Sequence, residues 1–236
     1  MTNHQSYRYA VYFAGEPKGE FWRLGSKWLG RCATGESVES FPVNMGIDPQ
    51  LLRRMTSQPR RYGWHATLKA PFSLRDDVPF FQLDETIKRL TQELTVFDLP
   101  CLVIKKMKNF LALAPLESTQ LHLDLKTTGS RCVEALHQLA KPLNESEIAY
   151  RKSSGLTKLE EGMMLQWGYP FVHDLFEFHF TLSNGLEQFE AHEVKALEDA
   201  AHLWFNPEMR IRFDRVSLFV EDIKGSDFKF LKDYCI

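Results

Sequence analysis

Two copies of a short pattern constrain the fold of this 236-residue chain more than any other feature. Residues 65–69 read HATLK and residues 179–183 read HFTLS, so each copy has a histidine, a threonine two positions later and then a leucine. Side chains alternate between the two faces of a strand, which puts the histidine and threonine of each copy on one face and the apolar residues on the other. The histidines lie 114 positions apart, about half the chain, which predicts two similar halves with one such strand each.

The segments around the two copies follow the same order. Alternating, aromatic and β-branched runs predict strands, and apolar residues at helical spacing predict helices. After each histidine strand we expect a loop, a helix and two strands. The predicted strands are 7–14, 64–68, 99–105, 109–114, 121–125, 176–182, 210–220 and 228–234, and the predicted helices are 21–31, 48–55, 82–94, 130–143 and 191–205. The charged stretch 144–170 ends in a turn-rich aromatic loop and is given no helix or strand.

This order predicts an α+β protein, a single bilobal domain over residues 1–236. Its lobes would cover roughly 1–115 and 116–236, each a pseudo-symmetric antiparallel sheet with helices on the outside, and strands could be exchanged between lobes. The active-site cleft would lie between them. With 44% hydrophobic residues, a chain of this length can bury a substantial core.

Charge and composition limit the classes of partner that the protein is expected to bind. A net charge of −2 provides no general positive field for long nucleic acid, so a small or single-stranded ligand is easier to justify. The N-terminus lacks the pattern of a signal peptide, and no run approaches the roughly 18 apolar residues of a membrane span, so we expect a cytoplasmic protein without membrane contact. The cysteines lack a C-x-x-C pair and are expected to be reduced structural thiols. No oligomeric state is predicted.

The paired pattern predicts acid–base chemistry on a phosphate ester. If the two strands face one another, the imidazoles of His65 and His179 and the hydroxyls of Thr67 and Thr181 converge. Imidazole titrates near pH 6.5, so one histidine could deprotonate water or a ribose hydroxyl while the other protonates the leaving oxygen. The threonine hydroxyls would donate hydrogen bonds to the phosphate oxygens. Which histidine is the base stays open.

No metal or cofactor is expected in this chemistry. A zinc site at the two histidines is the alternative, but Cys, Asp or Glu at ligand spacing is missing from their neighbourhood, and threonine is a poor zinc ligand.

Three further residues are candidates for substrate binding. Lys69 follows Thr67 by two positions and is expected on the same face, where it would add a positive charge. Arg151 lies upstream of the second copy and could bind phosphate, although most loop cations are simply solvated. Tyr169, in the aromatic loop, could line the cleft.

The two motifs resemble those of the two-histidine (2H) phosphoesterase superfamily. The segments RYAVYFA, RYGWHATLKAPF and VSLFVEDIKGSDFKFL, with the block 167–183, are further similar to the bacterial branch of it that phosphonate-utilisation operons often encode. This resemblance, which spans nearly the whole chain, implies a bilobal α+β fold and a site at His65, Thr67, His179 and Thr181. The second copy departs from the first at Ser183, where the first has Lys69.

The leading functional hypothesis is a metal-independent phosphodiesterase-type hydrolase that acts on a small cyclic phosphate or phosphodiester of ribose-phosphate, nucleotide or phosphonate metabolism. An alternative is an RNA-end cyclic phosphodiesterase or ligase, which the near-neutral charge disfavours. Another is a non-catalytic module that binds a phosphorylated metabolite.

Overall fold

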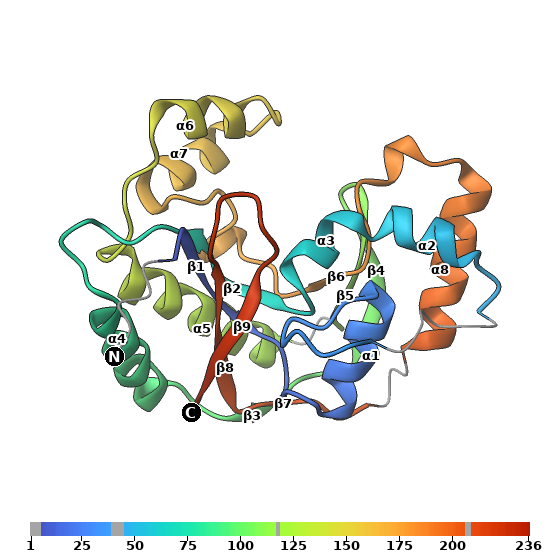
Figure 1. Cartoon of the computed structure of the whole chain (residues 1–236), viewed down its shortest axis with the longest axis horizontal. Helices are drawn as coiled ribbons and strands as arrows, with labels where there is room; N and C mark the ends of the chain where they lie inside the picture. The colour runs from blue at the N-terminus through green and yellow to red at the C-terminus, as the bar shows by residue number, and fades with distance from the viewer. Residues whose placement is uncertain (1–5, 39–44, 117–118, 206–208) are drawn as a thin grey trace.

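A seven-stranded sheet runs through the centre of the computed structural model, which describes residues 6–38, 45–116, 119–205 and 209–236 (Figure 1). Its strand order is β4-β5-β6-β2-β1-β8-β9, and the strand pairs described are antiparallel. These strands are β1 (Arg8–Phe13), β2 (Ala66–Phe72), β4 (Leu102–Met107), β5 (Phe110–Pro115), β6 (Phe180–Thr181), β8 (Arg215–Glu221) and β9 (Lys229–Cys235). A separate two-stranded sheet pairs β3 (Phe97–Asp98) with β7 (Arg212–Phe213).

Helices surround this sheet (Figure 1). Helix α5 packs on β2 and on α4, α4 also meets β9, and α8 meets β4. None of the helices in the described ranges is long and apolar enough to cross a membrane. The helices are α1 (Glu20–Leu29), α2 (Pro49–Met55), α3 (Ser57–Tyr62), α4 (Phe80–Glu93), α5 (Thr119–His137), α6 (Glu145–Lys152), α7 (Lys158–Trp167) and α8 (Ala191–Trp204), with 3-10 turns η1 (His173–Leu175) and η2 (Leu186–Gln188).

The elements after the two histidine motifs follow the same order, as predicted, but each helix is followed by three strands where the sequence predicted two. Strand β2 is followed by α4, β3, β4 and β5, and β6 is followed by α8, β7, β8 and β9. Equivalent strands of the two series also pair with each other, β2 with β6 and β3 with β7. Strand β1 lies between β2 and β8 and has no counterpart in the other series. The α+β class is therefore confirmed, whereas the division into two lobes stays a prediction because one sheet continues through both halves.

Because side chains alternate between the two faces of the central strands, the buried residues form two separate apolar clusters. Val11, Phe13, Ala66 and Phe180 belong to the larger apolar cluster, which the helices on that side complete. Tyr12, one residue from Val11, belongs instead to a smaller cluster together with partners such as Trp22, Phe219 and Phe228. Each face of β1 is thus covered, which explains its nearly continuous run of apolar and aromatic residues.

The prediction of a strand at 121–125 is wrong, because these residues belong to helix α5. The alternating leucines of this short run cannot by themselves exclude a helix. Leu125, Cys132 and Leu136 are buried at helical spacing, whereas Leu123 is 56% exposed, so the helical period extends through this segment. The side chains of residues 119–122, including His122, lie outside the described residues.

The stretch 144–170, expected to have no helix or strand, contains α6 and α7. Both helices begin with a capping box, in which the first side chain accepts a hydrogen bond from the backbone N–H three residues on, and the side chain of that residue accepts one from the backbone N–H of the first. The boxes join Asn144 to Glu147 and Thr157 to Glu160. These two helices lie together at one end of the molecule (Figure 1). Both capping boxes can be recognised in the sequence, but the high charge of the segment favoured its interpretation as a loop.

Candidate functional site

The two histidine motifs belong to neighbouring central strands: His65 and His179 directly precede β2 and β6, and Thr67 and Thr181 lie within them. Ala66 of β2 is paired with Phe180 of β6. Continuing this antiparallel register by one residue in each direction puts His65 beside Thr181 and Thr67 beside His179, and His179 is near enough to lower the pKa of His65. Ala66 and Phe180 are fully buried in the core, so alternation turns the four polar side chains to the other face. The structure thus brings together the four residues that the sequence singled out.

Both imidazoles are held in the same way. The Nδ1 of His65 lies 2.8 Å from the carbonyl oxygen of Gly63, and the Nδ1 of His179 lies 2.8 Å from that of Glu177. A carbonyl oxygen can only accept a hydrogen bond, so each Nδ1 carries the proton. In the neutral ring, each Nε2 then has a free lone pair with which to accept a proton.

The two histidines differ in their surroundings. The Tyr12 ring stacks on His65 with centroids 3.9 Å apart, and Tyr62 lies 6.0 Å away, whereas His179 meets Phe110 at 5.4 Å. Burial lowers the pKa of His65 to about 4, against the hydrogen bond to Gly63, and the nearby charge of His179 lowers it further. Burial also lowers the pKa of His179. Both rings are therefore neutral near pH 7 in the unliganded protein.

A buried carboxylate binds two arginine side chains near the aromatic rings that surround His65. Glu221 is 0% exposed, and its side chain accepts hydrogen bonds from Arg8 at 2.5 Å, from Arg61 and from the backbone N–H of Gly225 at 2.7 Å. Both arginines are therefore engaged by one partner. The carboxylate balances one of their two positive charges and holds both guanidinium groups, which makes them weaker candidates for binding a ligand anion than unpaired cations would be.

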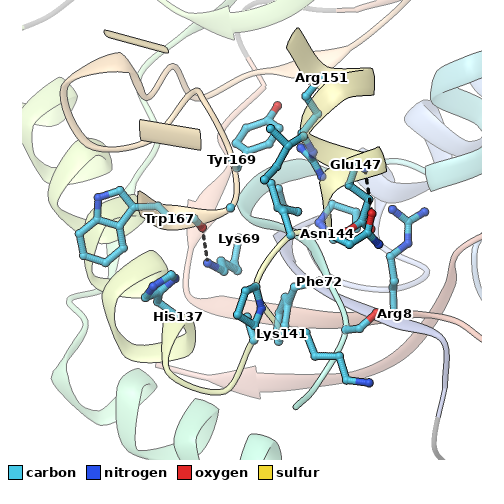
Figure 2. Close-up of a pocket in the computed structure, with 18 of the residues that line it drawn as sticks. Arg8, Lys69, Phe72, His137, Lys141, Asn144, Glu147, Arg151, Trp167 and Tyr169 are labelled. Carbon is cyan, nitrogen blue, oxygen red and sulfur yellow. Dashed lines mark hydrogen bonds between the residues drawn. The ribbon is translucent and has the colours of Figure 1, made fainter. Parts of the chain in front are cut away.

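A cavity of about 640 Å³ lies beside the stretch of β2 that follows Ala66, the residue paired with β6 (Figure 2). Its walls come from the start of β1, the end of β2, the segment after α5, helix α6 and the loop after α7. All three residues predicted to bind substrate, Lys69, Arg151 and Tyr169, line this cavity. The two His-x-Thr pairs do not, so the structure separates the candidate residues into two neighbouring groups.

The expectation that Lys69 shares the face of Thr67 is wrong. Tyr12 of β1 is paired with Thr67, and Val11, the residue before it, is paired with Lys69. One residue of β1 is therefore matched by a step of two residues in β2, which is a shift in register. Such a β-bulge inserts an extra residue and re-aims the side chains that follow it. Lys69 consequently leaves the histidine face and its Nζ donates a hydrogen bond to the carbonyl oxygen of Trp167, 3.3 Å away.

Tyr169 belongs to the cavity and also lies near aromatic residues of the histidine face. It lines the cavity, and its hydroxyl is close enough to Tyr62 and Arg151 for their charges to act on its pKa, which burial raises. Tyr12, which stacks on His65, is likewise influenced by Tyr169. Arg8, which also lines the cavity, lies over the Phe228 ring, and that ring stacks on Tyr62 beside His65, so the cavity and the histidine face are neighbours.

Sequence reasoning missed several residues of this region. Tyr12 and Arg8 lie on the opening strand, where they read as ordinary strand residues, and only the pairing of β1 with β2 brings Tyr12 against His65. His137 lines the cavity, and its ring lies 5.0 Å from that of Trp167. No local pattern marks these residues.

Within the described ranges, no group of three or more His, Cys, Asp or Glu side chains is arranged to hold a metal ion. The four cysteines are free, with Cys32 and Cys132 buried and Cys101 and Cys235 exposed.

Comparison with curated proteins finds two relatives with the same name, "Ribose 1,5-bisphosphate phosphokinase PhnN". The protein from Janthinobacterium sp. (strain Marseille) is 30% identical over 235 residues, covering 97% of this chain and 50% of the relative. The protein from Laribacter hongkongensis (strain HLHK9) is 32% identical over 222 residues, covering 94% of this chain and 50% of the relative. The chain thus spans about half the length of the curated relatives it matches.

These names correct the enzyme class expected from the sequence. A phosphokinase is a transferase, which contradicts the expectation of a phosphodiesterase-type hydrolase. The resemblance to the two-histidine superfamily stays a resemblance, since neither comparison names it. A family model does match residues 67–229, which include Thr67, His179 and Thr181. The chain belongs to this family, described as "Protein of unknown function (DUF1045)".

Proposed function

We propose that the face formed by His65, Thr67, His179 and Thr181 binds a phosphoryl group of a small phosphorylated metabolite and transfers it between oxygen atoms. The observation that carries this proposal is the β2–β6 register, which sets each histidine opposite the threonine of the other motif. Two hydroxyl donors suit the oxygens of a tetrahedral anion, and each Nε2 can take up a proton and then donate a hydrogen bond as well.

The paired histidines would serve as base and acid. One Nε2 takes the proton of an acceptor hydroxyl while that oxygen attacks phosphorus, and the other histidine, protonated, gives its proton to the oxygen that leaves. The hydroxyls of Thr67 and Thr181 donate hydrogen bonds to the non-bridging oxygens as their charge grows. Because both rings are neutral before the ligand binds, the ligand's own negative charge must raise the pKa of the acidic histidine.

The relatives' names support a phosphorylated ribose as the substrate class. They name ribose 1,5-bisphosphate, and "PhnN" accords with the phosphonate-operon context that the sequence resemblance implies. A mononucleotide-binding P-loop is not part of the proposal, because the sequence has no GxxxxGK[ST] motif. Its nearest approach, GRCATGES at residues 30–37, has glutamate at the lysine position.

A second candidate function is binding without turnover. The neutral state of both histidines favours it, because the unliganded site holds no imidazolium ready to act as an acid. Such a module would hold the same phosphorylated ribose and leave it unchanged.

Phosphorus NMR separates these possibilities. Ribose 5-phosphate and ribose 1,5-bisphosphate, each with and without adenosine triphosphate, are incubated with the wild type, with His65→Asn, with His179→Asn and with the control His192→Asn on the exposed side of α8. We expect a phosphoryl rearrangement or transfer that both site variants slow by at least ~100-fold and the control leaves unchanged. Binding with an unchanged spectrum would establish the second function, and absence of both would overturn the proposal.

A further inference from the structure

Lys69 is a buried cation without a negative partner. The residue is 4% exposed, and its ammonium meets the Trp167 carbonyl oxygen at 3.3 Å and the Phe72 ring at 5.8 Å. In the described part of the chain, no carboxylate pairs with it. Burying an ammonium group is costly unless it is paired, so this arrangement is most easily maintained by a function that uses the charge.

A second unpaired cation faces the same cavity. The guanidinium of Arg151 forms no hydrogen bond or ion pair with the described residues, and Figure 2 shows it above Tyr169 at the cavity wall. The other charged side chains there have partners: Arg8 binds Glu221, and Lys141 binds Asp76 at 2.6 Å. Glu147, the carboxylate of this wall, accepts the backbone N–H of Asn144 at 2.9 Å, a neutral group, so it counts as one negative charge against the two positive charges of Lys69 and Arg151. The cavity therefore has a positive excess.

The size and walls of the cavity suit an organic anion. Its volume of about 640 Å³ lies within the ~300–1,000 Å³ of small-molecule sites and leaves room for more than one phosphate ion. Phe72, Trp167 and Tyr169 provide aromatic surface beside the charges (Figure 2). The Nδ1 of His137 is buried and lacks a hydrogen-bond partner among the described residues, so a further polar contact is available.

We propose that this cavity binds a second anionic group of the metabolite whose phosphoryl group lies at the histidines, with Lys69 and Arg151 as its ligands. The inference rests on the proposed function, and it assigns the substrate to small sugars with two phosphate or phosphonate groups. Arg8 of the cavity wall lies over Phe228, which stacks on Tyr62 beside His65, so one ligand that reaches both groups would pass this wall.

Calorimetric titration tests this assignment. Ribose 1,5-bisphosphate, ribose 5-phosphate and inorganic phosphate are titrated into the wild type, Lys69→Met, Lys69→Arg, Arg151→Met and the double variant His65→Asn/His179→Asn. Lys158→Met on α7, exposed and outside the cavity, is the control. We expect the wild type to bind the bisphosphate at least tenfold more tightly than the monophosphate. Lys69→Met and Arg151→Met should remove that advantage, and Lys69→Arg should restore part of it.

The outcomes distinguish this inference from the proposed function. If the bisphosphate binds both cavity variants as it binds the wild type and only the double histidine variant loses it, the cavity assignment is overturned and the histidine site stands. If the cavity variants lose bisphosphate binding and the double histidine variant keeps it in full, the histidine site is overturned and the cavity remains an anion-binding site. Inorganic phosphate that binds through Lys69 as tightly as the bisphosphate would show a separate anion site and overturn the single-ligand proposal. Thermal unfolding of each variant verifies that it is folded.

Discussion

The Tyr12 ring stacks on the His65 imidazole with centroids 3.9 Å apart, while the Tyr12 hydroxyl is buried and lacks a hydrogen-bond partner within the described residues. A buried unsatisfied hydroxyl costs ~1–3 kcal/mol. We therefore expect Tyr12→Phe to keep the stacked ring and raise the free energy of unfolding by about 1 kcal/mol, as measured by urea denaturation. The matched control is Tyr9→Phe. The Tyr9 hydroxyl accepts a hydrogen bond from the Ser6 N–H at 3.2 Å, so its removal should lower the free energy of unfolding by about 1 kcal/mol. Equal losses in both variants would mean that the Tyr12 hydroxyl is satisfied.

The four residues of the histidine face could be found from the sequence because two local rules suffice. Alternation within each strand assigns His65 and Thr67 to one face, and the repeat identifies the second strand as its equivalent. Trp64, which alternation assigns to the core, is indeed 1% exposed. Pairing of β2 with β6 was the additional step that only the structure supplies.

Other parts of the region depend on features without a local signal. The bulge that turns Lys69 away from Thr67 arises from the pairing of β2 with β1, residues more than 50 positions apart in the sequence. The cavity joins the start of β1, the end of β2 and helix α6, which no spacing relates. Arg151 and Tyr169 were candidates because of their chemical type and their place before the second motif, which cannot tell a cavity wall from a solvated surface.

Acid should weaken the fold through His65. Its pKa is about 4 in the folded protein because of burial and near 6.5 in an unfolded chain. Above pH 6.5 the ring is neutral in both states and contributes nothing. As the pH falls from 6.5 to 4, the unfolded chain binds the proton first, so the free energy of unfolding should fall by up to about 3 kcal/mol.

Urea denaturation between pH 7 and 4 measures this loss. His65→Asn should lose less stability over that range than the wild type, and the exposed-helix control His192→Asn should follow the wild type. Identical pH profiles for His65→Asn and the wild type would contradict the burial of a neutral imidazole.

Replacement of Lys69 should stabilise the protein. Burial lowers its pKa to about 8 from 10.5, and its titratable neighbours on α5 are Cys132 and His137. Below pH 8 the lysine is charged in both states and the folded state bears the desolvation cost. We expect Lys69→Met to raise the free energy of unfolding at pH 7 by up to about 3 kcal/mol. The gain should shrink between pH 8 and 10.5, where the folded lysine loses its proton before the unfolded one does.

Chemical denaturation at pH 7 and pH 10 compares Lys69→Met with Lys158→Met, an exposed lysine of α7 expected to show no such gain. A loss of stability in Lys69→Met at pH 7 would show that the ammonium supports the Trp167 loop rather than serving a ligand.

Gly25 of α1 determines where the first histidine motif sits. A Cβ atom at this position would lie 1.8 Å from the indole of Trp64, the residue before His65. Trp64 is itself stacked between Phe180 at 4.8 Å and Phe205 at 5.5 Å, so it has little room to move. Helix propensity alone predicts that Gly→Ala stabilises a helix by ~1 kcal/mol, whereas overpacking a core costs ~1–3 kcal/mol or more.

We expect overpacking to dominate, so that Gly25→Ala lowers the free energy of unfolding by at least about 2 kcal/mol and weakens binding of a phosphorylated ligand at His65. Gly162→Ala in α7 is the matched control, because a Cβ there meets nothing within 4 Å, and it should gain about 0.5–1 kcal/mol. Denaturant titration of both variants measures the difference. If Gly25→Ala were as stable as Gly162→Ala, Trp64 would have to yield, and the tight contact that positions His65 against β6 would not be required for folding.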